Sequence, residues 1–170
     1  MRLYLVQHGE AVDSSIDPDR PLTALGREVV STQADTLVQS GVVGSTILHS
    51  GKPRARETAE ILAATLIGEG FDASSAQVAE IAMGPNADIE PWLAAINALS
   101  VDTMLVGHQP FMGRLAAALV AGDSQGVRVC FTPGTVLCLL QDPNQDQRKN
   151  ETGQWQLLAL LNPALRAEMR

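Results

Sequence analysis

The sequence predicts an α/β protein: a three-layer α/β/α sandwich with a mostly parallel central sheet and an antiparallel edge. Short apolar runs alternate with helical patterns along the 170 residues, which is typical of βαβ units. Residues 3–6 are apolar, and so is the run 103–106 apart from its first residue, Thr103, as expected of parallel strands covered on both faces. The last two runs, 134–141 and 154–160, have no helix between them, which predicts an antiparallel pair.

The sequence of the first half of the chain predicts two strands and two helices. Residues 2–7 form a buried strand, and Thr23 is placed to cap a helix over 24–39 that ends at Gly41. Residues 45–49 form the second strand, and Pro53 suits the first turn of a helix that runs to about 67. The side chains expected to face inward are Leu25, Val29, Ala34, Leu37 and Val38 on the first helix, and Thr58, Ile61, Leu62, Thr65 and Leu66 on the second.

The second half continues the alternation. A short strand at 77–81, a turn at 84–86 and a helix over 88–99 lead to the buried strand at 103–106. Pro110 begins a further helix, which Gly122 ends, and a polar loop over 142–153 joins the last two strands. A chain of this length with 45% hydrophobic residues can bury one substantial core. We therefore expect a single domain over residues 1–170.

Composition excludes several classes of function. The net charge of −7 argues against general binding to nucleic acid or to anionic membranes, because both need a basic surface. Cys130 and Cys138 lie in apolar runs without metal-ligand or CxxC spacing, so we expect two small core residues and no disulfide. The N-terminal apolar run is short, and no run approaches the length of a membrane span. We expect a cytoplasmic protein with no membrane association.

Polar side chains follow three of the predicted strands. His8 and Gly9 follow the first strand, Arg54 lies in the first helical turn after the second, and His108 follows the strand at 103–106. Parallel strands bring their carboxyl ends to one edge of the sheet, so these side chains should converge. Two imidazoles and a guanidinium suit a phosphoryl group, because the arginine binds oxygens bidentately and a histidine can act as nucleophile.

The same residues carry a resemblance to the histidine phosphatase superfamily, and within it to the small SixA-type phosphohistidine phosphatases. The resemblance runs nearly from end to end, in both order and spacing. The absence of a long insertion between the second and third strands favours the SixA type over the phosphoglycerate mutases. The motifs are Gln7-His8-Gly9-Glu10 (usually Arg-His-Gly-Glu), Arg20-Pro21-Leu22-Thr23 followed by Gly26, Ser50 with Arg54 four and Thr58 eight residues later, and Gly107-His108.

The resemblance implies that His8 is the nucleophile, that Arg54 clamps the phosphate and that His108 donates to the same oxygens. It also implies catalysis without a metal or other cofactor, and the chain's three histidines have no metal-ligand spacing. His8 must be neutral to attack phosphorus, whereas His108 serves best when protonated, so we expect their pKa values to be pushed apart. Ser50 is expected to cap the next helix.

Four residues are candidates for binding the substrate: Gln7, Gly9, Arg20 and Asn86. Asn86 and Asp88 fit helix capping first, and a site role for Asn86 is the alternative. Gln7 replaces the family's arginine and so loses a positive charge. A charged hydrogen bond contributes about 1.5–3 kcal/mol and a neutral one about 1, which predicts binding weaker by about tenfold or more unless another residue compensates. Arg20 is the hypothesised substitute.

The leaving group bears on the substrate. A phosphomonoester expels a poor alkoxide and needs an acid, whereas an imidazole needs little acid catalysis. Glu80, Asp88 and Glu90 have no spacing that marks an acid. We therefore predict a metal-independent phosphatase that binds phosphate and hydrolyses phosphohistidine on a protein partner, a phosphotransfer domain or phosphocarrier, through phosphorylated His8. A phosphatase for small phosphomonoesters and a phosphate-binding module with little turnover remain alternatives.

Overall fold

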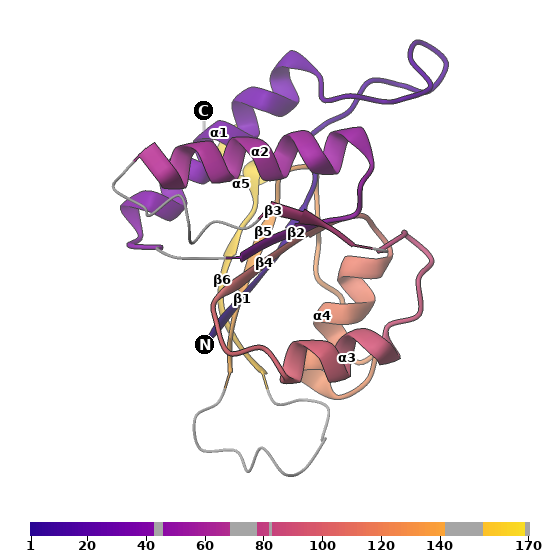
Figure 1. The fold of residues 1–170 in the computed structure, drawn as a ribbon, viewed down its shortest axis with the longest axis vertical. Helices are drawn as coiled ribbons and strands as arrows, with labels where there is room; N and C mark the ends of the chain where they lie inside the picture. Colours follow the sequence, from indigo (N-terminus) through magenta and orange to yellow (C-terminus); the bar gives the residue numbers. More distant parts are fainter. Residues whose placement is uncertain (43–45, 69–77, 82, 142–154, 169–170) are drawn as a thin grey trace.

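The computed structural model describes residues 1–42, 46–68, 78–81, 83–141 and 155–168. Its centre is a six-stranded sheet in the order β3-β2-β4-β1-β5-β6 (Figure 1). β3, β2, β4 and β1 run parallel, and β5 and β6 add an antiparallel pair next to β1. The predicted fold class is confirmed. The strands are β1 (Arg2–Gln7), β2 (Thr46–His49), β3 (Val78–Glu80), β4 (Thr103–Gly107), β5 (Val136–Gln141) and β6 (Trp155–Leu161).

Helices cover both faces of the sheet. α1 (Ala24–Gln39) and α2 (Pro53–Gly68) pack on one face, and α3 (Glu90–Asn97) and α4 (Phe111–Ala121) on the other (Figure 1). The Thr23 hydroxyl accepts a hydrogen bond from the Gly26 amide, as predicted for the cap of α1. Gly122 ends α4 in the left-handed conformation at φ 76°, which glycine adopts without strain. The short helix α5 (Pro163–Glu168) was not predicted, because six residues carry too little periodicity.

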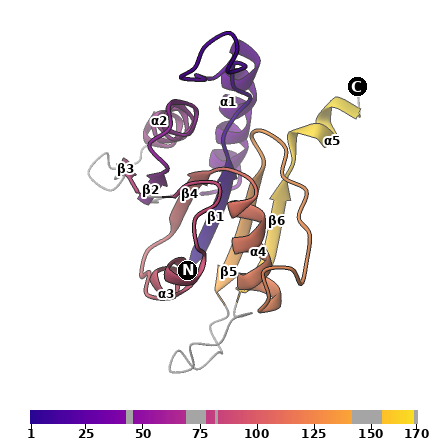
Figure 2. The same ribbon diagram turned by 90° about the vertical axis from the view of Figure 1, so that its right-hand side faces the viewer.

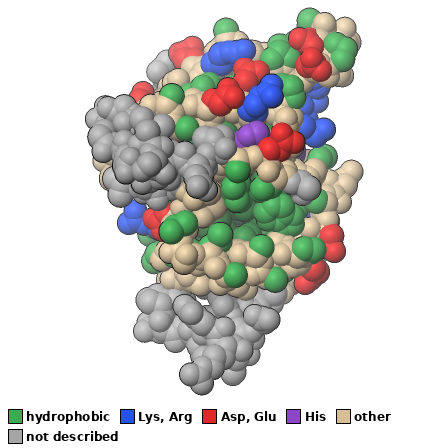
Figure 3. All heavy atoms as spheres, in the orientation of Figure 1, with side chains coloured by type: hydrophobic (Ala, Val, Ile, Leu, Met, Phe, Trp, Pro, Cys, Tyr) green, Lys and Arg blue, Asp and Glu red, His purple; other side chains and the backbone are tan. Residues whose placement is uncertain are grey.

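β1 divides the core between the two faces. Leu3 and Leu5 join the cluster beneath α3 and α4, whereas Tyr4 and Val6 join the cluster beneath α1 and α2. Side chains alternate across a strand, so one buried strand supplies both cores. The two halves of the exposed surface differ in charge. On the face shown in Figure 3, charged side chains gather in the half that holds α1 and α2, and a histidine is visible among them.

Two predictions about burial were wrong. Leu25 is 55% exposed, because the inward stripe of α1 begins one residue later, at Gly26, and continues through Val30 and Ala34. Cys130 is exposed in the segment between α4 and β5, whereas Cys138 is buried as predicted. An apolar neighbourhood in sequence therefore places a cysteine in the core only where it belongs to a buried strand.

Several boundaries also differ. β5 begins at Val136 rather than at 134, because Gly134 has a positive φ of 83° and turns the chain. α3 is shorter than the predicted 88–99, and the predicted loop over 142–153 lies outside the described residues. No helix in the described ranges is long and apolar enough to cross a membrane.

Candidate active site

The carboxyl ends of β1, β4 and β2 meet at one edge of the sheet. Gln7 pairs in register with Gly107, and His49 with Val106, so the segments that follow leave the sheet at the same level. The rings of His8 and His108 lie edge to face with their centroids 4.9 Å apart. Arg54 Nε donates to His8 Nε2 at 3.2 Å. The structure thus brings together the three residues that the sequence predicts as catalytic.

The His8 imidazole is held in a single tautomer. Its Nδ1 lies 2.6 Å from the Gly9 carbonyl oxygen, and a carbonyl only accepts, so Nδ1 carries the hydrogen. Nε2 therefore presents a lone pair, which accepts the hydrogen bond from Arg54. The residue is 9% exposed. This atom can act as a nucleophile without first losing a proton.

His108 has a different environment. Its Nε2 lies 2.6 Å from the Ser50 hydroxyl oxygen, while its Nδ1 is buried without a hydrogen-bond partner among the described residues. The prediction that Ser50 caps α2 was wrong: its hydroxyl contacts His108, and the Ala55 and Arg56 amides in the first turn of α2 bond to the Lys52 carbonyl. The motif spacing included Ser50, yet nothing in the sequence indicated that its partner is His108.

Gly9 connects the end of β1 to both helices of its face. Its amide donates to Thr58 Oγ1 at 3.1 Å, and the Thr58 hydroxyl donates to the Arg54 carbonyl at 2.7 Å. A Cβ at Gly9 would lie 2.8 Å from Val30 Cγ2, so α1 packs at a distance that only glycine permits. Gly9, which the sequence predicts as a substrate-binding residue, already uses its amide to position α2.

Gln7 lies beneath the site and is only 8% exposed. Its backbone is fixed, because its amide donates to the Thr135 carbonyl and its carbonyl accepts from the Gly134 amide. The side-chain oxygen is buried without a hydrogen-bond partner in the described part of the chain. A buried amide oxygen without a partner carries a desolvation cost. Gln7 therefore brings no charge to the end of β1, where the resemblance implies an arginine.

The other two predicted binding residues lie differently. Arg20 has a left-handed backbone at φ 51°, and its Nε donates to the Val12 carbonyl at 3.1 Å. Its charge is close enough to lower the pKa values of His8, Arg54 and His108. Asn86 is exposed in the turn before α3, and no hydrogen bond between described residues ties it to the histidines. The structure brings Arg20 toward the site and does not join Asn86 to it.

Burial sets the protonation of both imidazoles. It lowers the pKa of His8 from 6.5 to about 4, with a further lowering from the Arg54 charge that the Gly9 hydrogen bond opposes. Burial also lowers the pKa of His108 to about 3, helped by the charges of His8 and Arg54. We predicted that the pKa values of His8 and His108 are pushed apart, and for the protein without substrate this prediction is wrong. Both are lowered, because both rings are buried beside the same guanidinium.

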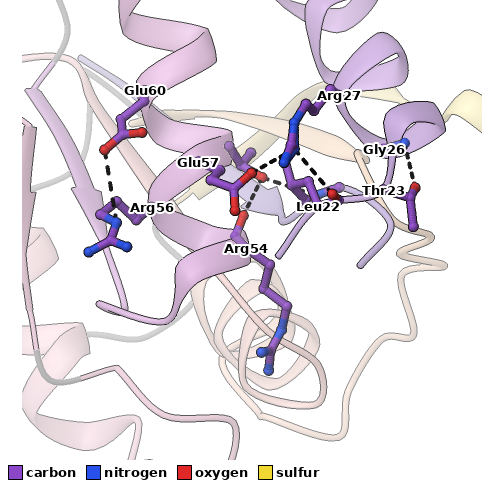
Figure 4. A network of polar contacts seen from close by, with 10 residues as sticks. Leu22, Thr23, Gly26, Arg27, Arg54, Arg56, Glu57 and Glu60 are labelled. Atoms are coloured by element: carbon purple, nitrogen blue, oxygen red, sulfur yellow. Dashed lines mark hydrogen bonds and ion pairs between the residues drawn. The ribbon is translucent and has the colours of Figure 1, made fainter. Parts of the chain in front are cut away.

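Figure 4 shows how α2 directs its charged side chains. Arg54 points away from Arg56, which pairs with Glu60 at 3.9 Å on another side of the helix. Glu57 forms an ion pair with Arg27 of α1 at 2.7 Å, and Arg27 also donates a hydrogen bond to the Leu22 carbonyl. The Arg27–Glu57 pair therefore joins the two helices beside the site and leaves the Arg54 guanidinium for His8.

The candidate acids are not equivalent. The Glu80 carboxylate lies against Gly51, where a Cβ would clash with it, next to Ser50. Asp88 accepts from the Glu90 amide in the turn before α3, whose N-cap is Ile89, and Glu90 lies in the first turn of the helix. No three His, Cys, Asp or Glu side chains within the described ranges are grouped so that they could hold a metal ion. Glu80 is the carboxylate that the structure places beside Ser50.

Comparison with known proteins gives the relatives of this chain. It is 39% identical over 128 residues to an uncharacterized protein of Picosynechococcus, covering 73% of this chain and 76% of the relative. It is 25% identical to the phosphohistidine phosphatase SixA of Escherichia coli, covering 92% and 93% of the two chains. The solved structure of SixA complexed with tungstate matches with a TM-score of 0.79 at 22% identity, over 98% of this chain and 99% of that one. No protein-family model matches the chain.

The mixed six-stranded sheet covered by helices is an α/β fold shared with the SixA structure. The chain belongs to the histidine phosphatase superfamily. Within that superfamily it is SixA-like.

Proposed function

We propose that the chain hydrolyses phosphohistidine on a protein partner, through a phosphoryl intermediate on His8 and without a metal or cofactor. The observation that carries the proposal is the fixed tautomer of His8, whose Nδ1–H is held by the Gly9 carbonyl while Nε2 faces Arg54. A nucleophilic nitrogen needs an unprotonated lone pair at working pH, and Arg54 would release this one when its guanidinium turns to the phosphoryl oxygens. With its pKa lowered to about 4 by burial, His8 is neutral near pH 7.

The reaction has two displacements at phosphorus. His8 Nε2 attacks, the N–P bond to the substrate imidazole breaks, and that imidazole leaves with the electron pair and takes a proton from water. A second water then attacks the phosphoryl group on His8, which releases inorganic phosphate and restores the neutral ring. Arg54 and His108 bind the phosphoryl oxygens, where added negative charge is stabilised.

The phosphoryl group also bears on His108. The pKa of His108 is lowered by burial and by the positive charges around it. A phosphoryl dianion between the rings would supply an opposing charge, and an opposite charge at close range favours the protonated form. His108 would therefore take up a proton as substrate binds, which provides the cation that was expected of it.

The similarity to SixA phosphohistidine phosphatases supports the substrate class. Tungstate, which one of these relatives holds, is a tetrahedral oxyanion like phosphate. A single observation favours a second function, a phosphate-binding module with little turnover: the neutral Gln7 stands where the family has arginine.

The proposal is tested by trapping the intermediate. The purified protein, in the presence of EDTA, is given a peptide carrying ³²P-phosphohistidine and, separately, p-nitrophenyl phosphate. We expect phosphate release from the peptide and a label on the protein that survives base and is lost in acid. His8→Ala should carry no label, while His49→Gln, a change at another buried strand-end histidine, should keep it.

Each of the other outcomes would contradict the proposal in a different way. Turnover that persists in His8→Ala would refute the intermediate. Release from p-nitrophenyl phosphate but not from the peptide would favour a phosphomonoesterase. Phosphate binding without release from either compound would favour the binding module.

A further inference from the structure

A groove beside α4 has no part in the chemistry described above. It is a cavity of about 320 Å³ between the start of α4 and the segment that follows the helix. We call it the α4 groove. Gln109, Gly113 and Arg114 line it on the helix side, and Gln125, Val127 and Arg128 on the other.

The α4 groove is continuous with the active site through the chain. Gln109 directly follows His108, whose carbonyl accepts from the Met112 amide in the first turn of α4. The segment after α4 lines the groove and then returns to the start of β5 (Figure 2). There the Gly134 amide donates to the carbonyls of Gln7 and His8. The segments that line the groove are therefore joined directly to those that carry His8 and His108.

The groove is lined by two arginines and contains two unpaired donors. Arg114 is fixed by a hydrogen bond from Nη2 to the Ala87 carbonyl at 2.6 Å, yet its Nε is buried without an acceptor in the described part of the chain. Gln109 Nε2 is likewise buried and unpaired among the described residues. Arg128 adds a second guanidinium at the exposed side. The neighbouring acid, Asp123, accepts from the Gln125 amide.

This donor set fits an anion that can accept several hydrogen bonds. A buried donor left unpaired is costly, and a guanidinium binds a carboxylate through two parallel hydrogen bonds. The rest of the groove wall includes Val127 and Val129, which suits the carbon stem of a side chain. The two arginines give the groove positive charge although the chain has a net charge of −7. Charge complementarity therefore favours an acidic occupant.

We propose that the α4 groove binds an aspartate or glutamate side chain of the partner protein, close in the partner's chain to its phosphohistidine. The identity of the partner as a phosphohistidine protein rests on the proposed function. The groove then adds specificity for sequence around the phosphoryl group, because Arg54 and the histidines contact only the phosphoryl group itself.

The test uses two synthetic peptides that each carry one phosphohistidine and differ only in having aspartates or asparagines in the three residues on either side. Binding is measured by fluorescence anisotropy on His8→Ala, and kcat/KM is measured on the wild type. We expect the aspartate peptide to bind about fivefold more tightly, the upper range for an exposed charge pair. Arg128→Glu should abolish this preference and leave turnover of the asparagine peptide unchanged.

Arg56→Glu is the matched control, since it makes the same charge change on α2, outside the groove. It should keep the preference for the aspartate peptide. Equal binding of the two peptides, or a preference that survives Arg128→Glu, would overturn the proposal. So would acetate binding at Arg128 as tightly as the peptide, since the groove would then be a site for small anions.

The two proposals fail separately. Hydrolysis of both peptides without an aspartate preference would leave the proposed function standing and refute the groove. An aspartate preference in binding, with no hydrolysis of either peptide, would support the groove and refute the function.

Discussion

The parallel and antiparallel halves of the sheet contribute to the site in different ways. β1, β4 and β2 deliver side chains at their carboxyl ends, and β1 and β4 are almost wholly buried. The segment before β5 supplies backbone groups instead, since the Gly134 amide and the Thr135 carbonyl bond to the end of β1. β6 has leucines exposed at its edge. The parallel half should therefore be sensitive to single side chains, whereas the exposed edge of the antiparallel half, on β6, should be tolerant of them.

The largest effect is expected at Arg54, the cation in contact with the proposed nucleophile. Arg54→Ala should lower kcat/KM by about a thousandfold, the scale found when a group that stabilises transition-state charge is removed. Arg56→Ala on the same helix should have little effect, because that side chain points away. Steady-state kinetics on the phosphohistidine peptide measures both. Comparable losses in the two variants would mean that α2 contributes general positive charge rather than a placed guanidinium.

The buried histidines should make stability depend on pH. In the unfolded chain a histidine binds a proton below about 6.5, whereas the folded protein holds the pKa of His8 at about 4 and that of His108 at about 3. The unfolded state thus binds more protons below pH 6.5, and stability falls as pH decreases through this window. At pH 5 each histidine should cost about 2 kcal/mol of unfolding free energy relative to pH 7.5.

Urea denaturation at pH 7.5 and pH 5 checks this dependence. His8→Gln should lose less stability than the wild type between the two values, because one of the titrating groups is gone. The carboxylates are the same in both proteins, so the difference reports the loss of His8 together with its effect on the pKa of His108. Identical losses would contradict the lowered pKa of His8. All three histidines of the chain lie at strand ends in the parallel half. The pH dependence of stability that comes from histidine therefore arises in that half.

Gly26 tests the packing that holds the site in place. A Cβ at this position would collide with the Glu10 carbonyl oxygen, next to the His8-Gly9 turn. Gly26→Ala should therefore cost about 1–3 kcal/mol of unfolding free energy, the range for an overpacked core. Gly84→Ala is the matched control, since a Cβ there meets nothing within 4 Å. Urea midpoints compare the two, and an equal response would show that α1 can shift without loss.

The sequence predicted the parallel half better than the site within it. Apolar runs and the Thr23 cap gave its strands and α1, and the common edge of parallel strands predicted that His8, Arg54 and His108 converge. The contact of Ser50 with His108 depends on side-chain rotamers across two strands, which no local pattern encodes. The lowered pKa of His108 reflects burial by distant segments. The α4 groove depends on residues 124–129, which form no regular structure and so leave no periodic signal.

Gln7 is the place where restoring a family feature should sharpen the comparison. Gln7→Arg exchanges a neutral side chain for a cation beneath the phosphoryl site and should tighten inorganic phosphate binding by about tenfold. Gln39→Arg, which adds the same charge on an exposed position of α1, should change it little. Isothermal titration with phosphate measures both. An unchanged affinity in Gln7→Arg would indicate that Arg20 already substitutes, and Arg20→Ala would then weaken binding.

The smallest effect is expected at the edge of the antiparallel half. Leu157 on β6 is 57% exposed, so Leu157→Gln should change the unfolding free energy by no more than about 0.5 kcal/mol. Leu137 on the adjacent strand is fully buried, and Leu137→Ala should cost about 2–5 kcal/mol. Urea denaturation at two protein concentrations measures both variants. A larger loss of stability in Leu157→Gln, growing with protein concentration, would mean that a second chain covers β6 in solution. The exposure of β6 in the single chain would then not predict tolerance to substitution.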